Sequence, residues 1–510
     1  MGDFIQQGSD SGINPEPNVA KTGLVRELGL LGLAATGICS MLGAAINVVP
    51  IMIHRNVPGI GPYVLHAYFF AAIPAILAAL AYAILSSAMP RAGGSYIYGS
   101  RGVSPYLGFI ASFSQWFGLS IAIGVVSYVI TFFLRDIAAV MDWLSLAEKL
   151  DSGFVRVTLA LGFLWTFVIV NLRGISLYER TLVPLMFLMF ALGTVVIVAG
   201  FSFDHQDFLA AVQIKEEYAV SDVATPPFRI GTYLAAAALL FSSFIGFDSI
   251  AQAGGEAKNP TRSLPLAIGI AVFTVGTFYM LFTAAVYHAV PWTYMAEHAQ
   301  TQDLTAPGLL GHLLPIGWTV AIIAGAAIAL INDLPAMLLA VSRLMFAWAE
   351  DGIFPRSVAS VHHRWHTPHV AIILSGVVAS VGILGSQLAG DFFLGFDILV
   401  TSMLVNFLVM CLAVLTLPQK NPEIAKDIRV IQSRRIQVFV ALVGVVIISV
   451  FLAATVWKDL TSQVEAWYFH STPVWLIVMA LATVIYIKEL RNLRATGVDT
   501  DELFSALPVE

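Results

Sequence analysis

Long apolar stretches separated by short polar ones fill most of the chain. Because about 20 apolar residues cross a bilayer as one helix, the pattern predicts twelve membrane-spanning helices. The first six are expected near residues 29–53, 62–88, 105–133, 155–172, 182–202 and 229–253. The second six are expected near 266–290, 315–348, 369–387, 393–417, 436–457 and 474–488. The chain is therefore expected to be an all-α integral membrane protein.

Two of the expected helices are interrupted by glycine and small polar residues. The sixth passes through residues 242–246 and carries an acid, Asp248, and the first is interrupted within residues 39–50. A broken helix frees backbone N–H and C=O groups, which inside a membrane must bond to protein, water or a polar ligand. Two such breaks, one opening each half of the core, predict a binding site near the middle of the membrane.

Composition supports the membrane assignment. Of 510 residues, 58% are hydrophobic and 11% are charged, and the mean hydropathy is +0.83. Soluble domains carry about 25% charged residues. The net charge of −6 gives no reason to expect a nucleic-acid partner. Cys39 and Cys411 both lie in apolar stretches, so neither a disulfide framework nor a zinc site is expected.

Four motifs follow one another along the chain. They are GAAI at 43–46 with Pro50, PRAGGSYIY at 90–98 with Gly108 and Phe109, FIGFD at 244–248 with EAKNP at 256–260, and SRLMFA at 342–347 with DGIFP at 351–355. In order and spacing this set resembles the amino acid, polyamine and organocation (APC) superfamily of transporters.

The resemblance implies a leucine-transporter-like fold of two inverted five-helix repeats, with helices 1 and 6 broken at the ligand site. It also implies secondary active transport of amino acids or related amines by alternating access, as a symporter or an exchanger. The transporter core would span residues 26–417 (helices 1–10), followed by helices 11 and 12 in 418–490. Residues 1–25 and 491–510 are expected to be cytoplasmic tails, the first of them disordered.

The first break has side chains small enough for a ligand to approach the backbone. N–H groups there could hold a carboxylate, and the carbonyls freed at the second break could accept hydrogen bonds from an ammonium group. The expected substrate-binding residues are Gly43, Ala44, Ala45, Ile46, Phe241, Ser242, Phe244, Ile245 and Gly246. The alternative is that the small residues serve only close helix packing.

Asp333 is an acid at membrane depth, next to Asn332 in helix 8, and it must face protein or water. Asp333 and Asn332 are expected to take part in coupling, with the acid binding a proton, a sodium ion or the cationic end of a substrate. The alternative is an acid satisfied by Asn332 or by a neighbouring arginine. No cofactor is expected beyond a possible coupling proton or sodium ion. The histidine-rich loop at 362–369 lacks a completing carboxylate or cysteine, so no metal site is expected.

Four residues are expected to gate the site: Phe244, Asp248, Arg91 and Glu256. The alternative for Phe244 is a packing role, and the alternative for Asp248 is that it caps the local backbone. For Glu256 and Arg91 the alternative is a solvated loop that they share with Lys258 and Arg262. In cationic amino acid transporter relatives, helix 5 carries a lysine that stands in for a sodium ion. Residues 174–200 contain no lysine here, which leaves Asp333 for coupling or an exchanger that needs no coupling ion.

Lys and Arg are concentrated in loops on one side, which predicts cytoplasmic N- and C-termini in a plasma (cell inner) membrane. An enzyme is not expected, because no HExxH, GxSxG or paired catalytic carboxylates occur. An amine or polyamine exchanger and a non-transporting amino-acid sensor remain alternatives. The expected partners are a small-molecule amino acid or amine and the lipid bilayer, with no nucleic acid and no obligate protein partner.

Overall fold

A computed structural model of the chain describes residues 23–216, 224–389, 393–464 and 466–508. Within these ranges the structure is helical, and eleven helices are long and apolar enough to cross a membrane. They are α1–α2 (Leu30–Met41 and Ala44–Asn56), α3 (Val64–Ala88), α5 (Pro105–Val140), α7 (Gly153–Leu172), α8 (Ile175–Ser202), α12 (Pro260–Ala289), α15 (Ile316–Glu350), α16 (His369–Ala389), α17 (Phe393–Lys420), α19 (Arg434–Thr461) and α20 (Ser471–Ala495).

A shorter apolar helix completes the expected set. It consists of α10 (Ile230–Leu240) and the 3-10 turn η2 (Phe241–Phe244), and α11 (Asp248–Gln252) follows after an interruption. The eleven long helices and this broken one occupy the twelve positions that the apolar pattern predicts, which confirms the all-α membrane fold.

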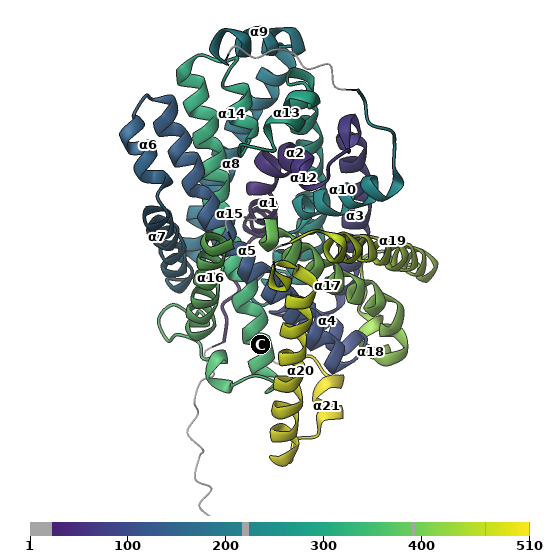
Figure 1. Ribbon diagram of the computed structural model, residues 1–510. Helices are drawn as coiled ribbons and strands as arrows, with labels where there is room; N and C mark the ends of the chain where they lie inside the picture. The colour runs from purple at the N-terminus through teal and green to yellow at the C-terminus, as the bar shows by residue number, and fades with distance from the viewer. Residues whose placement is uncertain (1–22, 217–223, 390–392, 465, 509–510) are drawn as a thin grey trace, which may run out of the picture.

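Short helices also occur outside the long ones, where the apolar pattern predicts none. They are α4 (Gly94–Gly102), α6 (Leu144–Asp151), α9 (His205–Glu216), α13 (Trp292–His298), α14 (Ala306–Leu310), α18 (Pro422–Lys426) and α21 (Thr500–Ser505). Figure 1 shows α9 at one end of the bundle and α21 at the other. These are called the α9 end and the α21 end below.

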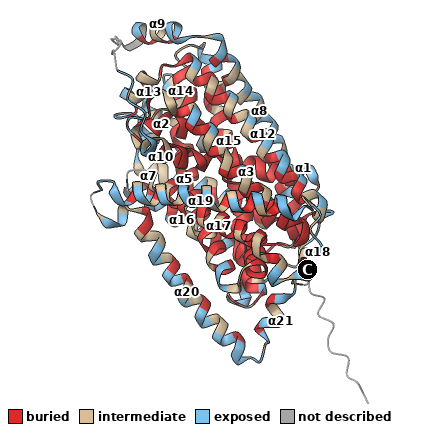
Figure 2. Ribbon diagram, turned by 90° about the vertical axis from the view of Figure 1, so that its right-hand side faces the viewer, coloured by how far each residue is buried: buried red, intermediate tan, exposed pale blue. Residues whose placement is uncertain are grey.

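The core lies around α1, α5 and α15. Nearly every residue of α1 is buried, whereas few residues of α20 are (Figure 2). Small residues allow close approach in the interior: a methyl group on Gly124 of α5 would collide with the main chain of Ala379 in α16. In a membrane such close packing replaces the hydrophobic effect as the force between helices.

The first and last described segments of the chain both lie at the α21 end. Leu28 pairs with the segment after α11, through Leu28 N–H to the Glu256 carbonyl (2.9 Å) and Lys258 N–H to the Leu28 carbonyl (2.8 Å). Residues 1–22 of the expected first tail lie outside the described residues. At the other terminus α20 continues to Ala495, beyond its expected end, and α21 begins at an Asp499 cap.

Candidate functional site

The two helix breaks touch each other. α1 ends at Met41 and α2 begins at Ala44, while the second break centres on Gly246, whose φ of +135° favours glycine. A methyl group on Gly246 would collide with the main chain of Ser40. The second break therefore packs directly on the last turn of α1, at a distance that only a hydrogen atom permits.

Side chains satisfy several of the backbone groups that the breaks release. The Tyr279 hydroxyl donates to the Met41 carbonyl, and the Gly246 N–H donates to Oδ1 of Asp248 at 3.1 Å. The hydroxyls of Ser40 and Ser249 share a hydrogen bond of 3.0 Å across the two segments. The breaks are therefore stable features of the fold, because side chains hydrogen-bond to the backbone groups that the breaks expose.

A small enclosed cavity lies beside the breaks. Its volume is about 30 Å³, which is space for about two water molecules. It is lined from α1, α5, η2, α15 and α17, which are the expected helices 1, 3, 6, 8 and 10. The lining residues are Ser40, Met41, Gly43, Leu119, Ala122, Val126, Ser242, Ile245, Asp333, Met337, Phe396 and Leu399.

Asp333 is the acid in this lining, and it is 5% exposed. Its Oδ2 lies against Gly43, so closely that a methyl group on Gly43 would collide with it. Its Oδ1 has no hydrogen-bond partner among the residues that the structure describes, and no described cation forms an ion pair with Asp333. Asn332 donates elsewhere, to Cys39 Sγ (3.0 Å) and the Leu182 carbonyl (3.2 Å). The described contacts thus give no support to the alternative in which Asn332 or an arginine satisfies Asp333.

Three of the nine expected substrate-binding residues line the cavity: Gly43, Ser242 and Ile245. Ile46 lines a second cavity of about 20 Å³, beside Asn47 and facing α8 and α12. The α2 helix begins at Ala44, and the side chains of Ala44 and Ala45 lie outside the described residues.

The other expected residues of the second break pack around the site. The Phe241 ring lies against Phe407 and Phe451, at 6.0 and 6.1 Å between centroids. The Phe244 ring packs against Tyr68 and Tyr279, at 5.5 and 5.9 Å. Phe244 is not part of the cavity lining, so its gating role stays a prediction.

Asp248 belongs to a buried polar network on the α21 side of the breaks. The network comprises Tyr82, Ser95, Gln115, Asp248, Gln252 and Asn406. Gln115 donates to Asp248 at 2.5 Å, and Asn406 donates to Tyr82 at 2.7 Å. Ser95 accepts from Gln252 at 2.6 Å. Five helices are joined by this network, and its amide members carry no sequence signal that marks them as partners of Asp248.

Two buried ion pairs lie nearer the α21 end. Glu256 accepts two hydrogen bonds from Arg343, at 2.5 and 3.1 Å, and both side chains are at most 2% exposed. Glu256 therefore pairs with Arg343 and not with Arg91, which donates to the Pro508 carbonyl at 2.9 Å, and the gating roles of Glu256 and Arg91 stay predictions. Lys258 and Arg262 are exposed, as a solvated loop would be.

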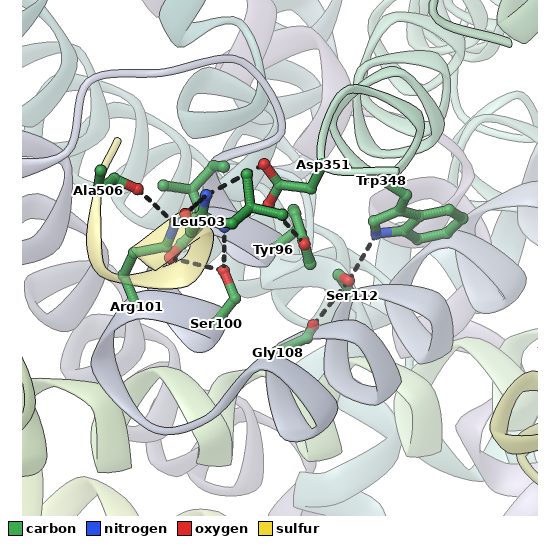
Figure 3. A network of polar contacts seen from close by, with 10 residues as sticks. Tyr96, Ser100, Arg101, Gly108, Ser112, Trp348, Asp351, Leu503 and Ala506 are labelled. Carbon is green, nitrogen blue, oxygen red and sulfur yellow. Dashed lines mark hydrogen bonds and ion pairs between the residues drawn. The ribbon is translucent and has the colours of Figure 1, made fainter. Parts of the chain in front are cut away.

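The second pair joins Arg101 of α4 to Asp351 after α15 (Figure 3). Tyr96 also donates to Asp351, at 2.6 Å. Burial alone would lower the pKa of Arg101, but the Asp351 carboxylate outweighs it and raises that pKa. Burial and Asp351 both raise the pKa of Tyr96.

The C-terminal helix covers this second pair. Arg101 donates to the carbonyls of Ala506 (3.1 Å) and Leu503 (3.4 Å), and the guanidinium lies 5.5 Å from the centre of the Phe504 ring. Figure 3 shows these carbonyls directed at the guanidinium group from α21. The α21 helix therefore contacts Arg101 of α4, which pairs with Asp351 at the end of α15.

Comparison with known proteins gives a consistent family. The family model described as amino acid permease matches residues 28–482. The branched-chain amino acid permease BcaP of Bacillus subtilis is 27% identical over 412 residues, which cover 79% of this chain and 83% of the relative. The low-affinity putrescine importer PlaP of Escherichia coli is 25% identical over 77% of this chain and 80% of the relative. A vacuolar cationic amino acid transporter 4 of Arabidopsis thaliana is 29% identical over 70% of this chain and 58% of the relative. The chain belongs to the amino acid permease family of the APC superfamily.

Proposed function

We propose that this protein is a secondary active transporter that carries an amino acid or a related amine through the cavity beside the two helix breaks. The observation that carries the proposal is the contact between Gly246 and Ser40, which brings two broken helices together around the buried carboxylate of Asp333. Membership of a permease family, with relatives that include an amino acid permease and a putrescine importer, supports the substrate class.

Alternating access requires that the site open at one end of the bundle at a time. The cavity of about 30 Å³ is too small for an amino acid, so helices must move before a substrate enters. Toward the α21 end, the path is crossed by the Asp248 network and by the Glu256–Arg343 pair. We infer that opening at this end separates those contacts, which gives Asp248 and Glu256 their gating role.

The α21 end is proposed to face the cytoplasm of a cell with this protein in its plasma membrane. Arg91, Arg101 and Arg343 all lie at that end, and cytoplasmic loops of membrane proteins carry an excess of Lys and Arg. Coupling to a proton or a sodium ion would use Asp333, the acid of the cavity lining. Exchange without a coupling ion is the alternative mode.

Uptake into proteoliposomes tests the transport proposal. We expect a labelled amino acid or amine to accumulate, either with an imposed proton or sodium gradient or by exchange against the same compound inside. Gly246→Ala should abolish uptake, because the methyl group collides with Ser40. Gly269→Ala is the matched control, because a methyl group on this α12 glycine meets open space. Ligand binding without any uptake would show a sensor instead of a transporter.

A further inference from the structure

The carboxylate of Asp333 lies where the first helix restarts. Its Oδ2 is against Gly43, the residue directly before α2, and α2 is thirteen residues long. The first N–H groups of a helix have no partner within the helix, and its N-terminus carries a partial positive charge. An anion is favoured at this point, and the protein itself supplies one from α15.

This arrangement changes what the first break can bind. The backbone near Gly43 is the place where the carboxylate of an amino acid substrate would be expected to lie. A substrate carboxylate there would meet Asp333 at short range, in a cavity away from bulk water, and like charges repel strongly under those conditions. The break is therefore suited to a substrate that brings no carboxylate of its own.

The remaining polar groups of the lining can accept hydrogen bonds from a cation. Asp333 Oδ1 is buried and lacks a hydrogen-bond partner among the described residues, and so does the hydroxyl of Ser242. The lining contains no Lys, Arg or His among those residues. Buried acceptors without partners are costly, and an ammonium group could donate to both.

The rest of the lining limits the substrate further. Leu119, Val126, Met337 and Leu399 contribute apolar surface, and Asp333 is the acid among the described lining residues. A diamine would place its second ammonium group against this apolar wall without an acid to pair with it. Burial of an unpaired charge is unfavourable, so the wall suits an apolar body.

We propose that Asp333 takes the place of the substrate carboxylate, and that the substrate is a monoamine with an apolar body and no carboxylate. Its ammonium group donates to Asp333 Oδ1 and to Ser242, and its apolar part lies along α5, α15 and α17. This inference rests on the proposed transport through the same cavity and names the substrate class.

The test compares a monoamine and a diamine, each with the amino acid that differs from it only by a carboxylate. Isothermal titration of the purified full-length protein is carried out with isopentylamine, leucine (its carboxylated counterpart), cadaverine and lysine. We expect isopentylamine to bind about thirtyfold or more tightly than each of the other three, since misplacing one buried charge costs at least that factor.

Variants separate the roles of the two groups. Asp333→Asn should weaken isopentylamine binding by about thirtyfold or more, because it removes the charge partner. Asp397→Asn is the matched control: this acid lies next to the lining residue Phe396 but pairs with Lys458 at 3.5 Å, and its loss should leave binding unchanged. Asp333→Gly vacates the start of α2 and should make leucine bind at least as tightly as isopentylamine.

Each contrary result has a defined meaning. The proposed substrate class would be overturned if the unaltered protein bound leucine more tightly than isopentylamine. It would also be overturned if Asp333→Asn left isopentylamine binding unchanged. Tighter binding of cadaverine than of isopentylamine would overturn the proposal that the substrate has a single amine. In these cases uptake that is lost with Gly246→Ala would leave the transport proposal standing. If none of the four ligands binds and none enters proteoliposomes, both proposals fail together.

Discussion

Two buried acids, one packed against α15 and one on α15, differ in whether they have a cation partner. Glu256 is paired with Arg343 of α15 through two hydrogen bonds, whereas Asp333, on α15 itself, has no described cation partner. Ten residues, or about 15 Å of helix, separate Arg343 from Asp333. Burial is costly for both carboxylates. Arg343 offsets the cost of burying Glu256 within the fold, whereas the proposed ligand would offset the cost of burying Asp333.

Asp248 and Asp351 lie between these extremes. Asp248 is hydrogen-bonded by Gln115 and by the Gly246 N–H but has no described cation partner. Asp351 has a cation, Arg101, which also donates to Ser100 and to two carbonyls at the short terminal helix. If the cation partner of each acid sets its contribution to stability, replacing the four acids one at a time should lower stability by different amounts. The loss should be largest for Glu256 and smallest for Asp333.

The largest loss is expected for Glu256→Gln. Removing one member of a buried ion pair strands the other charge and costs about 3 to 5 kcal/mol, and Arg343 is 1% exposed. Thermal melting of the purified protein in detergent should therefore show a large drop in Tm. The double variant Glu256→Leu/Arg343→Met should recover much of that drop, because neither charge of this pair remains buried.

Glu423→Gln is the matched control for this loss. Glu423 also pairs with a base, Lys426, but both side chains are mostly exposed, and such pairs contribute about 1 kcal/mol or less. Equal melting temperatures for the Glu256 and Glu423 variants would mean that pairing at the α21 end does not stabilise the fold.

Asp351→Asn should cost less than Glu256→Gln. Hydrogen bonds to a charged group contribute about 1.5 to 3 kcal/mol, and Arg101 can gain water if α21 leaves its place. The loss should therefore be local. Hydrogen exchange is expected to speed up in residues 500–508 and to stay unchanged in α15. Unchanged exchange in 500–508 would show that the Arg101–Asp351 pair does not retain the terminal helix.

The positions of the helices were predictable because a membrane span needs a long apolar run with its backbone bonded internally. The breaks were predictable for the same reason, since Gly246 and Ser242 interrupt such a run. Asp333 could be singled out because any acid at membrane depth is conspicuous. Its environment could not, because the contact with Gly43 joins residues far apart in the chain.

Other parts of the site carry no local signal. Leu119, Met337 and Leu399 line the cavity, yet each stands among apolar neighbours that face other helices. The partner of Glu256 depends on how α15 packs, and Arg91 was an equally good choice by charge alone. The α21 helix has six residues, which is too short to be predicted without the tertiary contacts that stabilise it.

Asp248→Asn tests the acid that is hydrogen-bonded but unpaired. An asparagine oxygen can still accept from the Gly246 N–H, whereas its amide would oppose the donating amide of Gln115. A net loss of about 1 kcal/mol is expected, as for one ordinary hydrogen bond. The variant Asp248→Asn/Gln115→Glu returns an acceptor to the network, and its Tm should rise above that of the single variant. A loss equal to that of Glu256→Gln would indicate that Asp248 has a cation partner as well.

The smallest change is expected for Asp333→Asn in the absence of ligand. This variant removes a buried charge that has no described cation partner and leaves no opposite charge unpaired, while the asparagine oxygen can still accept at the start of α2. Its Tm should equal or exceed that of the unaltered protein, although the same substitution is expected to weaken amine binding by about thirtyfold or more. Stability and binding would then respond in opposite directions at one residue, which a packing role for Asp333 does not produce. A drop in Tm as large as that of Glu256→Gln would instead make Asp333 a structural acid and remove the basis for a ligand at Gly43.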